Sequence, residues 1–342
     1  MQYGKCVSFD RKWRKNKKYF RYQPYLYFKR FKFYFQKLNE LKLNIGLLIG
    51  GDSPERDVSL SSGKSILKAL ELLGNNVIAL DPKDGIHLLE KQILSVDLIF
   101  NGLHGGDGEN GNIAAYLESL GVLFTGSGEV SSRTCMDKNL SKRIVSENGF
   151  NTPKWLLRKT LPAKYQIEDL EFPIIVKPND LGSTIGLSFV KDKKELIDAY
   201  NDALKFTDSI IFESFIKGRE ITVPIIGSKS FPIVEIIPEN DLYDYECKYT
   251  EGMSEYFCPA DIDAALVSEI KNVALKIHKL LKCNHYSRVD FLLGEKDKLW
   301  FLEINTLPGM TETSLLPKSL KADGYSFEDT IQMILDEATK SL

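Results

Sequence analysis

The stretch SRVDFLLGEKDKLWFLEIN (287–305) contains two apolar segments separated by the polar turn GEKD. This pattern predicts a β-hairpin, in which successive side chains of each strand point to opposite faces. Arg288 and Asp290 share one face of the first strand, and Glu303 and Asn305 share one face of the second. The predicted hairpin therefore carries two pairs of polar side chains within apolar strands.

The relative position of these polar pairs depends on how the strands align. Pairing Leu293 with Lys298 around a four-residue turn would place Asp290 opposite Phe301 and bring both polar pairs to one face. Two carboxylates and an amide would then form an oxygen-rich site, which Mg²⁺ prefers and shares with nucleotide phosphates. The alternative is a solvated hairpin face, and the apolar neighbours of these residues disfavour it.

A second motif, IIVKPNDLGSTIG (174–186), joins a predicted strand to a loop of Gly, Ser and Thr. Small residues let backbone N–H groups approach phosphate oxygens, and Lys177 adds a positive charge at the end of the strand. The loop matches neither the P-loop nor the GxGxxG pattern. It predicts phosphate binding mainly because it occurs together with the hairpin.

Two further glycine-rich loops each follow a predicted strand, which is where open α/β folds bind ligands. NGLHGGDGENG (101–111) contains His104, and GGDSPERDVS (50–59) contains Glu55. A single histidine is more often structural than chemical, so a structural role is favoured for His104. Glu55 is a candidate for holding an ammonium group. The alternative is an acidic residue at a helix N-terminus, where the macrodipole stabilises it.

Alternating strands and helices between residues 43 and 126 predict a doubly wound α/β domain. Its expected strands are 43–51, 77–80, 96–103 and 122–128, and its expected helices are 65–74 and 113–120. A second alternating region is expected to contain helices 140–147 and 195–204 and strands 172–178 and 209–216. After Gly218 the sequence favours strands, until a final helix at 326–340.

The 342 residues are 43% hydrophobic and 27% charged, which is typical of a globular chain of two or three domains. No apolar run is long enough to predict a membrane-spanning helix. Five cysteines without CxxC spacing argue against a zinc site or a disulfide framework, and they favour a reducing cytosol.

Residues 1–42 differ from the rest of the chain. They hold thirteen Lys and Arg against two acidic residues, whereas the other 300 residues hold 32 basic and 45 acidic ones. Aromatic residues lie among the basic ones, and no apolar segment typical of a secretory signal is present. One interpretation is a surface that binds an anionic membrane or a nucleic acid. A poorly ordered extension is favoured, so we expect no specific nucleic-acid partner, and peripheral membrane contact is the less favoured alternative.

Taken together, the motifs resemble those of D-alanine–D-alanine ligases, which are ATP-grasp enzymes of peptidoglycan synthesis. The resemblance covers about residues 43–342 and leaves residues 1–42 without a counterpart. Asn110 stands where the family commonly has Asp, and little depends on this difference. The matching stretches, in order, are GGDSPERDVSLSSG, LHGGDGENG, FTGSG, MDK, IVKPNDLGSTIG, YDYECKY, YFCPA, RVDF and EINTLPGMTETSLLP.

The resemblance implies an N-terminal doubly wound, Rossmann-like (pre-ATP-grasp) α/β domain followed by a two-part ATP-grasp fold. The parts expected are an N-terminal substrate domain (43–126), a central ATP-binding subdomain (127–213) and a C-terminal subdomain with the metal site (214–342). The implied reaction joins two D-alanine molecules through an acyl phosphate and releases ADP and phosphate, in the cytoplasm. Two Mg²⁺ or Mn²⁺ ions per active site and a homodimer are also implied.

The resemblance assigns residues to each part of the reaction. ATP would be held by Lys138, Lys177, Glu213, Phe215, Ile216 and Glu220, the last at the ribose. The metal ions would be bound by Asp290, Glu303 and Asn305. The implied catalytic residues are Glu55, Ser183, Tyr249, Arg288, Gly309 and Ser314, and the implied substrate-binding residues are Glu55, His104, Lys248, Ser314 and Leu315.

Individual roles follow from the same resemblance. Glu55 would take the ammonium group of the first D-alanine and form a hydrogen-bonded set with Ser183 and Tyr249. Arg288 and the backbone N–H of Gly309 would stabilise the oxyanion, and Ser314 would hold the carboxylate of the second substrate. The polar, tyrosine-rich segment 243–257 is a plausible lid that keeps water from the acyl phosphate.

Three alternatives remain open. A D-alanine–D-lactate ligase is disfavoured because Tyr249 follows Lys248 in the segment ECKYT. A ligase of glutathione type would keep the hairpin but lack GGDSPERDVSL and PGMTETS. A non-catalytic ATP-grasp binding module, tethered by residues 1–42, is disfavoured because every charged residue that the chemistry needs is present.

Overall fold

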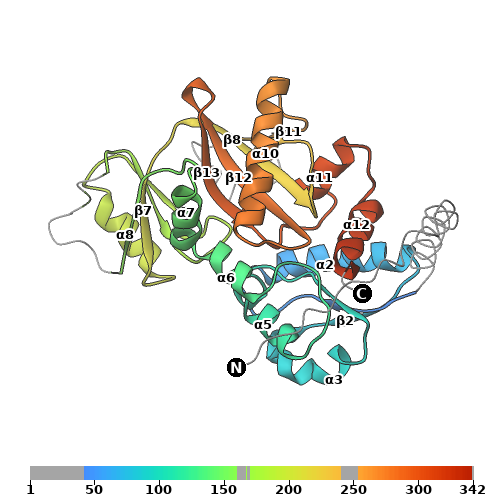
Figure 1. Cartoon of the computed structure of the whole chain (residues 1–342). Coiled ribbons are helices and arrows are strands. Elements are labelled where there is room, and N and C mark those ends of the chain that lie inside the picture. The colour runs from blue at the N-terminus through green and yellow to red at the C-terminus, as the bar shows by residue number, and fades with distance from the viewer. Residues whose placement is uncertain (1–41, 160–166, 168–169, 240–252, 341–342) are drawn as a thin grey trace, which may run out of the picture. The chain divides into compact units, whose positions relative to one another are not determined.

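A computed structural model describes residues 42–159, 167, 170–239 and 253–340 of the chain. The residues from Leu43 onward form one compact unit. In this unit, three β-sheets are described, of three, six and four strands, with helices between them (Figure 1). The α/β class expected from the sequence is confirmed.

The first sheet is parallel, as the alternating pattern predicted. Its strands are ordered β2-β1-β3, and α2 forms the crossover between β1 and β2. Helix α2 begins at Arg56, well before the predicted start at residue 65, and the predicted strand 122–128 contributes only a bridge between Phe124 and Ile99. The bounds are β1 (Asn44–Leu48), α2 (Arg56–Leu72), β2 (Asn76–Leu80), η1 (Pro82–Asp84), η2 (Ile86–Leu89), α3 (Glu90–Ile93), β3 (Leu98–Asn101), α4 (Gly106–Glu109) and α5 (Asn112–Ser119).

The four-stranded sheet is antiparallel, in the order β4-β7-β5-β6. Helix α8 packs on its apolar face through Leu196, Ala199 and Ala203. The strongest predicted strands, 172–178 and 209–216, are its two central strands. The bounds are α6 (Glu129–Met136), α7 (Lys138–Glu147), β4 (Trp155–Arg158), β5 (Ile174–Pro178), β6 (Ser188–Val190), α8 (Leu196–Leu204) and β7 (Ile210–Ser214).

The six-stranded sheet has the order β11-β10-β8-β12-β13, with β9 paired to β8. Helix α10 lies across this sheet (Figure 1) and buries Ile270, Ala274 and Ile277 against it. The prediction that strands dominate after Gly218 was therefore wrong for this helix. The bounds are β8 (Gly218–Ile226), β9 (Lys229–Ser230), β10 (Val234–Pro238), β11 (Ser254–Phe257), α10 (Ala264–Leu280), β12 (Tyr286–Gly294), η4 (Glu295–Asp297), β13 (Leu299–Asn305), α11 (Leu315–Ala322) and α12 (Phe327–Thr339).

The register of the β12–β13 hairpin differs from the predicted one. Leu293 pairs with Leu299 rather than with Lys298, so the connection contains one residue more than the predicted turn. Asp290 lies opposite Glu303 rather than opposite Phe301. Directly opposed residues project from the same face of a sheet. The prediction that the two polar pairs share one face is confirmed, although the predicted pairing was wrong.

A β-bulge at Leu302 explains how this face is built. The register shifts between Asp290 and Phe291, because β13 contains one residue more than β12 at this point. Phe301 can therefore point into the core, where its ring lies 6.3 Å from that of Phe291. Glu303 projects from the opposite face, beside Asp290.

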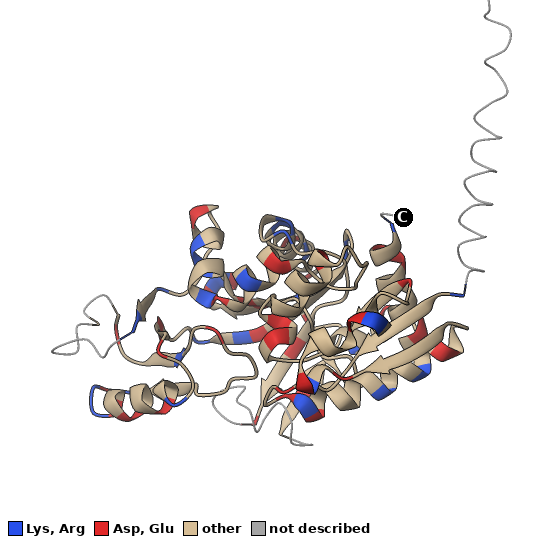
Figure 2. Ribbon diagram, turned by 90° about the horizontal axis from the view of Figure 1, so that it is seen from below, with Lys and Arg blue, Asp and Glu red and all other residues tan. Residues whose placement is uncertain are grey.

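One hydrophobic cluster joins the two ends of the compact unit. It contains Ile45 and Phe100 from the parallel sheet and Leu316, Ile331 and Ile334 from α11 and α12. Charged residues of both signs are spread over the described elements (Figure 2). Within the described residues, no helix is long and apolar enough to cross a membrane.

Candidate active site

Two neighbouring cavities are lined by most of the residues that the sequence singled out, although Asp290 lines neither. The first has a volume of about 720 Å³ and lies between the four-stranded and six-stranded sheets. The second has a volume of about 640 Å³ and lies between the six-stranded sheet and the loops that follow β1 and β3. Lys138, Gly182 and Glu303 line both cavities, so the two share a wall.

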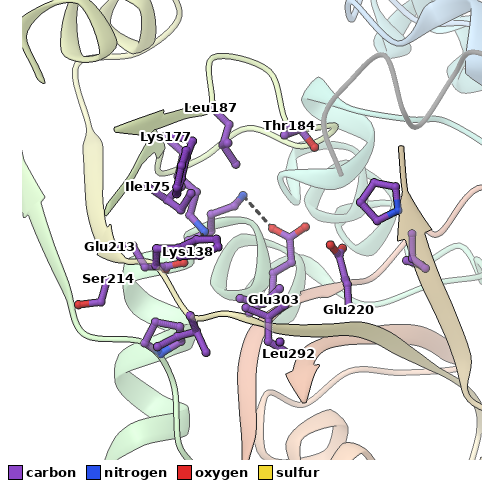
Figure 3. A pocket seen from close by; sticks show the side chains of 18 of the residues that line it. Lys138, Ile175, Lys177, Thr184, Leu187, Glu213, Ser214, Glu220, Leu292 and Glu303 are labelled. Atoms are coloured by element: carbon purple, nitrogen blue, oxygen red, sulfur yellow. Dashed lines mark hydrogen bonds and ion pairs between the residues drawn. The ribbon is translucent and has the colours of Figure 1, made fainter. Parts of the chain in front are cut away.

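The first cavity brings together the residues assigned to ATP. Apolar side chains from both sheets, including Ile175, Ile236 and Leu292, line it together with carboxylates and lysines (Figure 3). Such a mixture suits a flat base beside a charged phosphate chain. All six predicted residues line it: Lys138, Lys177, Glu213, Phe215, Ile216 and Glu220.

Glu213 lies at the centre of the charge arrangement in this cavity. Its Oε1 accepts a hydrogen bond from Nζ of Lys177 at 3.0 Å, and its Oε2 lies 2.7 Å from Nζ of Lys142. The second contact is short but poorly aligned for a hydrogen bond, so its attraction is that of an ion pair. Burial alone would raise the pKa of Glu213, but the two lysine charges outweigh it and hold that pKa below its usual value.

The loop after β5 reaches both cavities. Its residues Ser183 and Thr184 have φ angles of 51° and 61°, which lie in the left-handed region that favours glycine. Backbone held in this region costs free energy and is concentrated at ligand sites. Thr184 lines the first cavity and Ser183 lines the second. The loop therefore places adjacent residues in different cavities.

The second cavity brings together the residues assigned to catalysis and to the amino-acid substrates. Seven of them line it: Glu55, His104, Ser183, Arg288, Gly309, Ser314 and Leu315. Tyr249, Lys248 and most of the predicted lid 243–257 lie outside the described residues.

Glu55 precedes the first turn of α2, and its side chain makes no capping hydrogen bond there. Its carboxylate instead accepts a hydrogen bond from the hydroxyl of Ser183, which comes from a distant part of the sequence. The backbone of Gly105 approaches closely, since a Cβ atom there would lie 2.4 Å from Oε2 of Glu55. This contact, together with a φ of 64°, explains why glycine occupies position 105.

His104 is held by neighbours within the wall of the cavity. Its side chain is buried, its Nε2 is hydrogen bonded to Oγ of Ser62 at 2.9 Å, and its Nδ1 lies 3.7 Å from Oε1 of Glu109. The Ser62 hydroxyl also accepts a hydrogen bond from the backbone N–H of Met310. His104 thus links the loop after β3 to α2 and to the loop after β13.

Gly309 and Ser314 belong to the loop between β13 and α11. The Ser314 hydroxyl accepts a hydrogen bond from the backbone N–H of Thr311 at 3.0 Å and lies 2.8 Å from the Thr311 hydroxyl. A Cβ atom at Gly309 would lie 3.1 Å from Oγ of Ser314, so the two residues are in close proximity.

The polar face of the hairpin carries the residues assigned to the metal. Arg288 donates two hydrogen bonds, both of 2.9 Å, to the carboxylate of Asp290, and the Thr222 hydroxyl donates a third. Oε2 of Glu303 lies 3.2 Å from Nζ of Lys138. This ion pair is the dashed line in Figure 3. These contacts hold Glu303 on the wall that the cavities share, and Asp290 opposite it on the hairpin.

The donor set of this face fits a divalent cation. No cluster of three or more Asp, Glu, His or Cys that could hold a metal occurs within the described residues. Here Asp290 and Glu303 are opposed across the hairpin, and Asn305 adds an amide oxygen. Mg²⁺ usually takes only one or two carboxylates and completes its coordination with water and nucleotide phosphates.

The structure adds residues that the sequence reasoning missed. Thr222 supports Asp290, and Lys142 supports Glu213 from beneath the first cavity. A signal for Lys142 was present, because Lys138, Lys142 and Val145 have the spacing of one helix face and all three are buried. No comparable signal identifies Thr222, which is one β-branched residue within an apolar strand.

Several known proteins are similar to this chain over most of its length. The family model described as D-ala D-ala ligase C-terminus matches residues 144–336. The D-alanine–D-alanine ligase of Aquifex aeolicus is 41% identical over 298 residues, covering 86% of this chain and 100% of that protein. D-alanine–D-alanine ligase B of Clostridium perfringens is 39% identical over 296 residues, covering 86% and 97% of the two chains.

Solved structures agree with these matches. The D-alanine–D-alanine ligase of Bacillus anthracis complexed with ATP has a TM-score of 0.76 at 32% identity and covers 87% of this chain and 98% of that one. The VanG D-Ala:D-Ser ligase of Enterococcus faecalis has a TM-score of 0.78 at 26% identity, with coverage of 87% and 100%. The two sheets and the cavity between them define a ligase of the ATP-grasp class. Within that class, the chain belongs to the D-alanine–D-alanine ligase family.

Proposed function

We propose that this chain joins two D-alanine molecules to D-alanyl-D-alanine and converts ATP to ADP and phosphate. The observation that carries the proposal is the division of the predicted residues between two cavities. Six ATP candidates line one cavity, seven catalytic and substrate candidates line the other, and Lys138 and Glu303 line both. A phosphoryl group that passes between two substrates needs this kind of shared boundary.

The first proposed step activates the carboxylate of one D-alanine, because a carboxylate is a poor electrophile. One of its oxygens takes the γ-phosphoryl group of ATP, giving an acyl phosphate and ADP. Lys177 and Arg288 would offset the charge on the transferring group. Glu55, buttressed by the Ser183 hydroxyl, would hold the ammonium group of this D-alanine.

Mg²⁺ or Mn²⁺ is part of this proposal, and when bound it would neutralise phosphate charge. Asp290, Glu303 and Asn305 are the residues that would hold it. The pairing of Asp290 with Glu303 across the hairpin supports this role. Two ions per site, as the resemblance implies, remain a prediction.

In the second proposed step, the amine of the other D-alanine attacks the acyl carbon, and phosphate leaves. The tetrahedral oxyanion needs donors that are already aimed at it. Arg288, fixed by its two hydrogen bonds to Asp290, and the N–H of Gly309 are the proposed donors. Ser314 and Leu315 would contact the second substrate. Tyr249 and Lys248 are proposed to complete the closed site.

The proposed setting is the cytoplasm, since the reaction consumes ATP, and the product would enter peptidoglycan precursors. We further propose that 43–126, 127–213 and 214–342 act as the substrate, central and C-terminal parts, and that the enzyme is a homodimer. The ester-forming and non-catalytic alternatives are less well supported, because the relatives above are named for amide-forming ligation.

The test is phosphate release by the purified chain with Mg-ATP and D-alanine, and with D-alanine plus D-lactate, D-alanine plus D-serine, or L-alanine. With D-alanine as the only substrate besides Mg-ATP, we expect phosphate release matched by an equal amount of the dipeptide. A mixed product formed in preference to the dipeptide would change the assignment of the second substrate. Absence of ADP formation by a folded protein that binds ATP would refute the proposed reaction.

A further inference from the structure

Lys142 is a charged residue that the proposed mechanism does not use. It lies on α7, and its side chain is fully buried, with an exposed fraction of 0%. Its Nζ lies 2.7 Å from Oε2 of Glu213 and donates a hydrogen bond of 2.6 Å to Oγ1 of Thr152. The ring centre of Trp155 lies 5.3 Å from the same nitrogen. The ammonium group therefore contacts a carboxylate, a hydroxyl and an aromatic ring.

The contact with Glu213 leads into the first cavity. Glu213 lines that cavity and also accepts the hydrogen bond of Lys177, which lines it as well. The carboxylate thus lies between two ammonium groups, one in the cavity and one behind it. Lys142 attracts this carboxylate from outside the cavity, and Lys177 attracts it from within the cavity.

The contact with Thr152 leads to the polar hairpin. The Thr152 hydroxyl donates a hydrogen bond of 2.9 Å to the carbonyl oxygen of Phe301. Phe301 directly precedes the bulge at Leu302 that turns Glu303 toward the shared wall. A continuous chain of contacts therefore runs from Glu213 on β7 through Lys142 to β13.

Burying an ammonium group is costly, so a fully buried lysine needs a compensating role. Burial lowers the pKa of Lys142 to about 8, against the opposing effect of the Glu213 charge. An apolar residue of similar size would pack in this position without that cost. The arrangement is understandable if the positive charge is needed to hold groups of the active site.

We propose that Lys142 is a positioning residue that fixes Glu213, and through Thr152 the hairpin, at the spacing that nucleotide and metal binding require. The inference rests on the proposed ATP-dependent function. Lys142 touches no substrate, so its effect is transmitted through Glu213 and through β13. Loss of its charge should leave Glu213 paired with Lys177 alone and draw the Lys177 ammonium away from the phosphates.

The main variant is Lys142→Met, which keeps the length of the side chain and removes the charge. We expect the KM for ATP to rise about tenfold or more, because supporting residues commonly have effects of this size. The KM for D-alanine should change by less than about twofold, because the second cavity keeps its residues. Arg143→Met is the matched control, since this neighbour on α7 is exposed and loses the same charge. Thermal unfolding of each variant verifies that it is folded.

The pH profile separates positioning from packing. Lys142 on α7 and Lys177 on β5 are the charged groups that face Glu213, and Glu303 on β13 acts on Lys142. Without Lys142 the pKa of Glu213 should rise, so kcat/KM for ATP should begin to fall at a higher pH than in the wild type. Lys142→Arg retains a positive charge. On the acid side, its pH profile of kcat/KM for ATP should match that of the wild type, even if the larger guanidinium group lowers activity.

Thr152→Val tests the contact between Thr152 and Phe301. It also replaces Lys142→Met as the test if that variant does not fold. It should raise the Mg²⁺ concentration for half-maximal activity about threefold or more and leave the KM for ATP nearly unchanged. An active wild type combined with folded variants of unchanged KM, Mg²⁺ requirement and pH profile would overturn the inference. A wild type that forms no ADP would refute the proposed function. Binding of Mg-ATP to each variant, measured by calorimetry, would then still test the role of Lys142.

Discussion

At the scale of single residues, opposite charges set the geometry of the polar hairpin face. Arg288 and Asp290 are two positions apart on β12 and form a bidentate pair, which restricts both side chains more than a single hydrogen bond would. The pair is mostly buried, with side-chain exposures of 15% and 10%. Loss of either partner would remove this bidentate pairing and leave the charge of the other less well compensated.

Asp290→Asn is therefore expected to lower kcat about 100-fold at saturating Mg-ATP, which corresponds to about 2.7 kcal/mol of transition-state free energy. The amide is neutral, so it supports Arg288 poorly and binds a divalent cation weakly. Phosphate release in a steady-state assay measures the change. Asp297→Asn, at the exposed tip of the same hairpin, is the control and should match the wild type. Retention of more than about a third of wild-type activity by Asp290→Asn would contradict this role.

At the scale of elements, sequence patterns predicted most strands and several helices but not their alignment. Strands β5 and β7 begin with continuous apolar runs, and β12 alternates apolar with polar residues around Asp290, so all three strands could be predicted directly from the sequence pattern. The bulge in β13 could not, because it depends on the packing of Phe301 against Phe291 across the hairpin. Helix α10 was missed although its buried residues Ile270, Ala274 and Ile277 have helical spacing, since the strands on either side dominated the interpretation.

The candidate site was predictable to a similar degree. Residues within recognisable motifs, such as Lys177, Ser183 and Glu303, lie in the cavities as expected. Supporting residues such as Thr222 and Lys142 act through contacts between distant segments, and no local pattern specifies such contacts. Sequence reasoning thus identified residues at the cavity surface better than those beneath it.

Helix α10 is also the element for which a pH effect on stability is expected. Its buried His278 is hydrogen bonded to the hydroxyl of Ser287 on β12 at 2.7 Å. Burial lowers the pKa of His278 from 6.5 to about 4. Between these values the unfolded chain binds a proton that the folded chain does not, so stability falls as the pH is lowered through this range.

The expected loss for His278 is about 2 kcal/mol of unfolding free energy between pH 7.5 and pH 5. In His278→Leu this part of the pH dependence should disappear. Urea denaturation at the two pH values measures it, and His87→Leu, which changes an exposed histidine, is the control. An equal pH dependence in the wild type and in His278→Leu would contradict the assignment.

At the scale of the whole molecule, one core links the N-terminal sheet to the last two helices of the chain. Leu70 on α2 packs in the same cluster as Leu320 and Leu335. The catalytic candidates follow this arrangement, because Glu55 comes from the loop after β1 and Ser183 from the loop after β5. The site is thus assembled from parts far apart in the sequence, and it depends on their correct packing.

Residues 1–42 are expected to be dispensable for catalysis. The 298 residues matched in this chain cover the whole of the Aquifex aeolicus ligase, so that relative needs no further segment. Deletion of residues 1–41 should change kcat by less than about twofold in the phosphate-release assay, which is within about 0.4 kcal/mol. A loss of more than about tenfold would show that the basic segment contributes to the reaction.

The wall shared by the two cavities has a consequence for inhibitor design. A compound with one group in each cavity would bind its second group at a high effective concentration, so modest affinities could combine into a tight complex. Its linker would have to pass between Lys138 and Glu303, whose Nζ and Oε2 atoms lie 3.2 Å apart. A short anionic linker that pairs with Lys138 and displaces Glu303 would suit this passage better than a long neutral one.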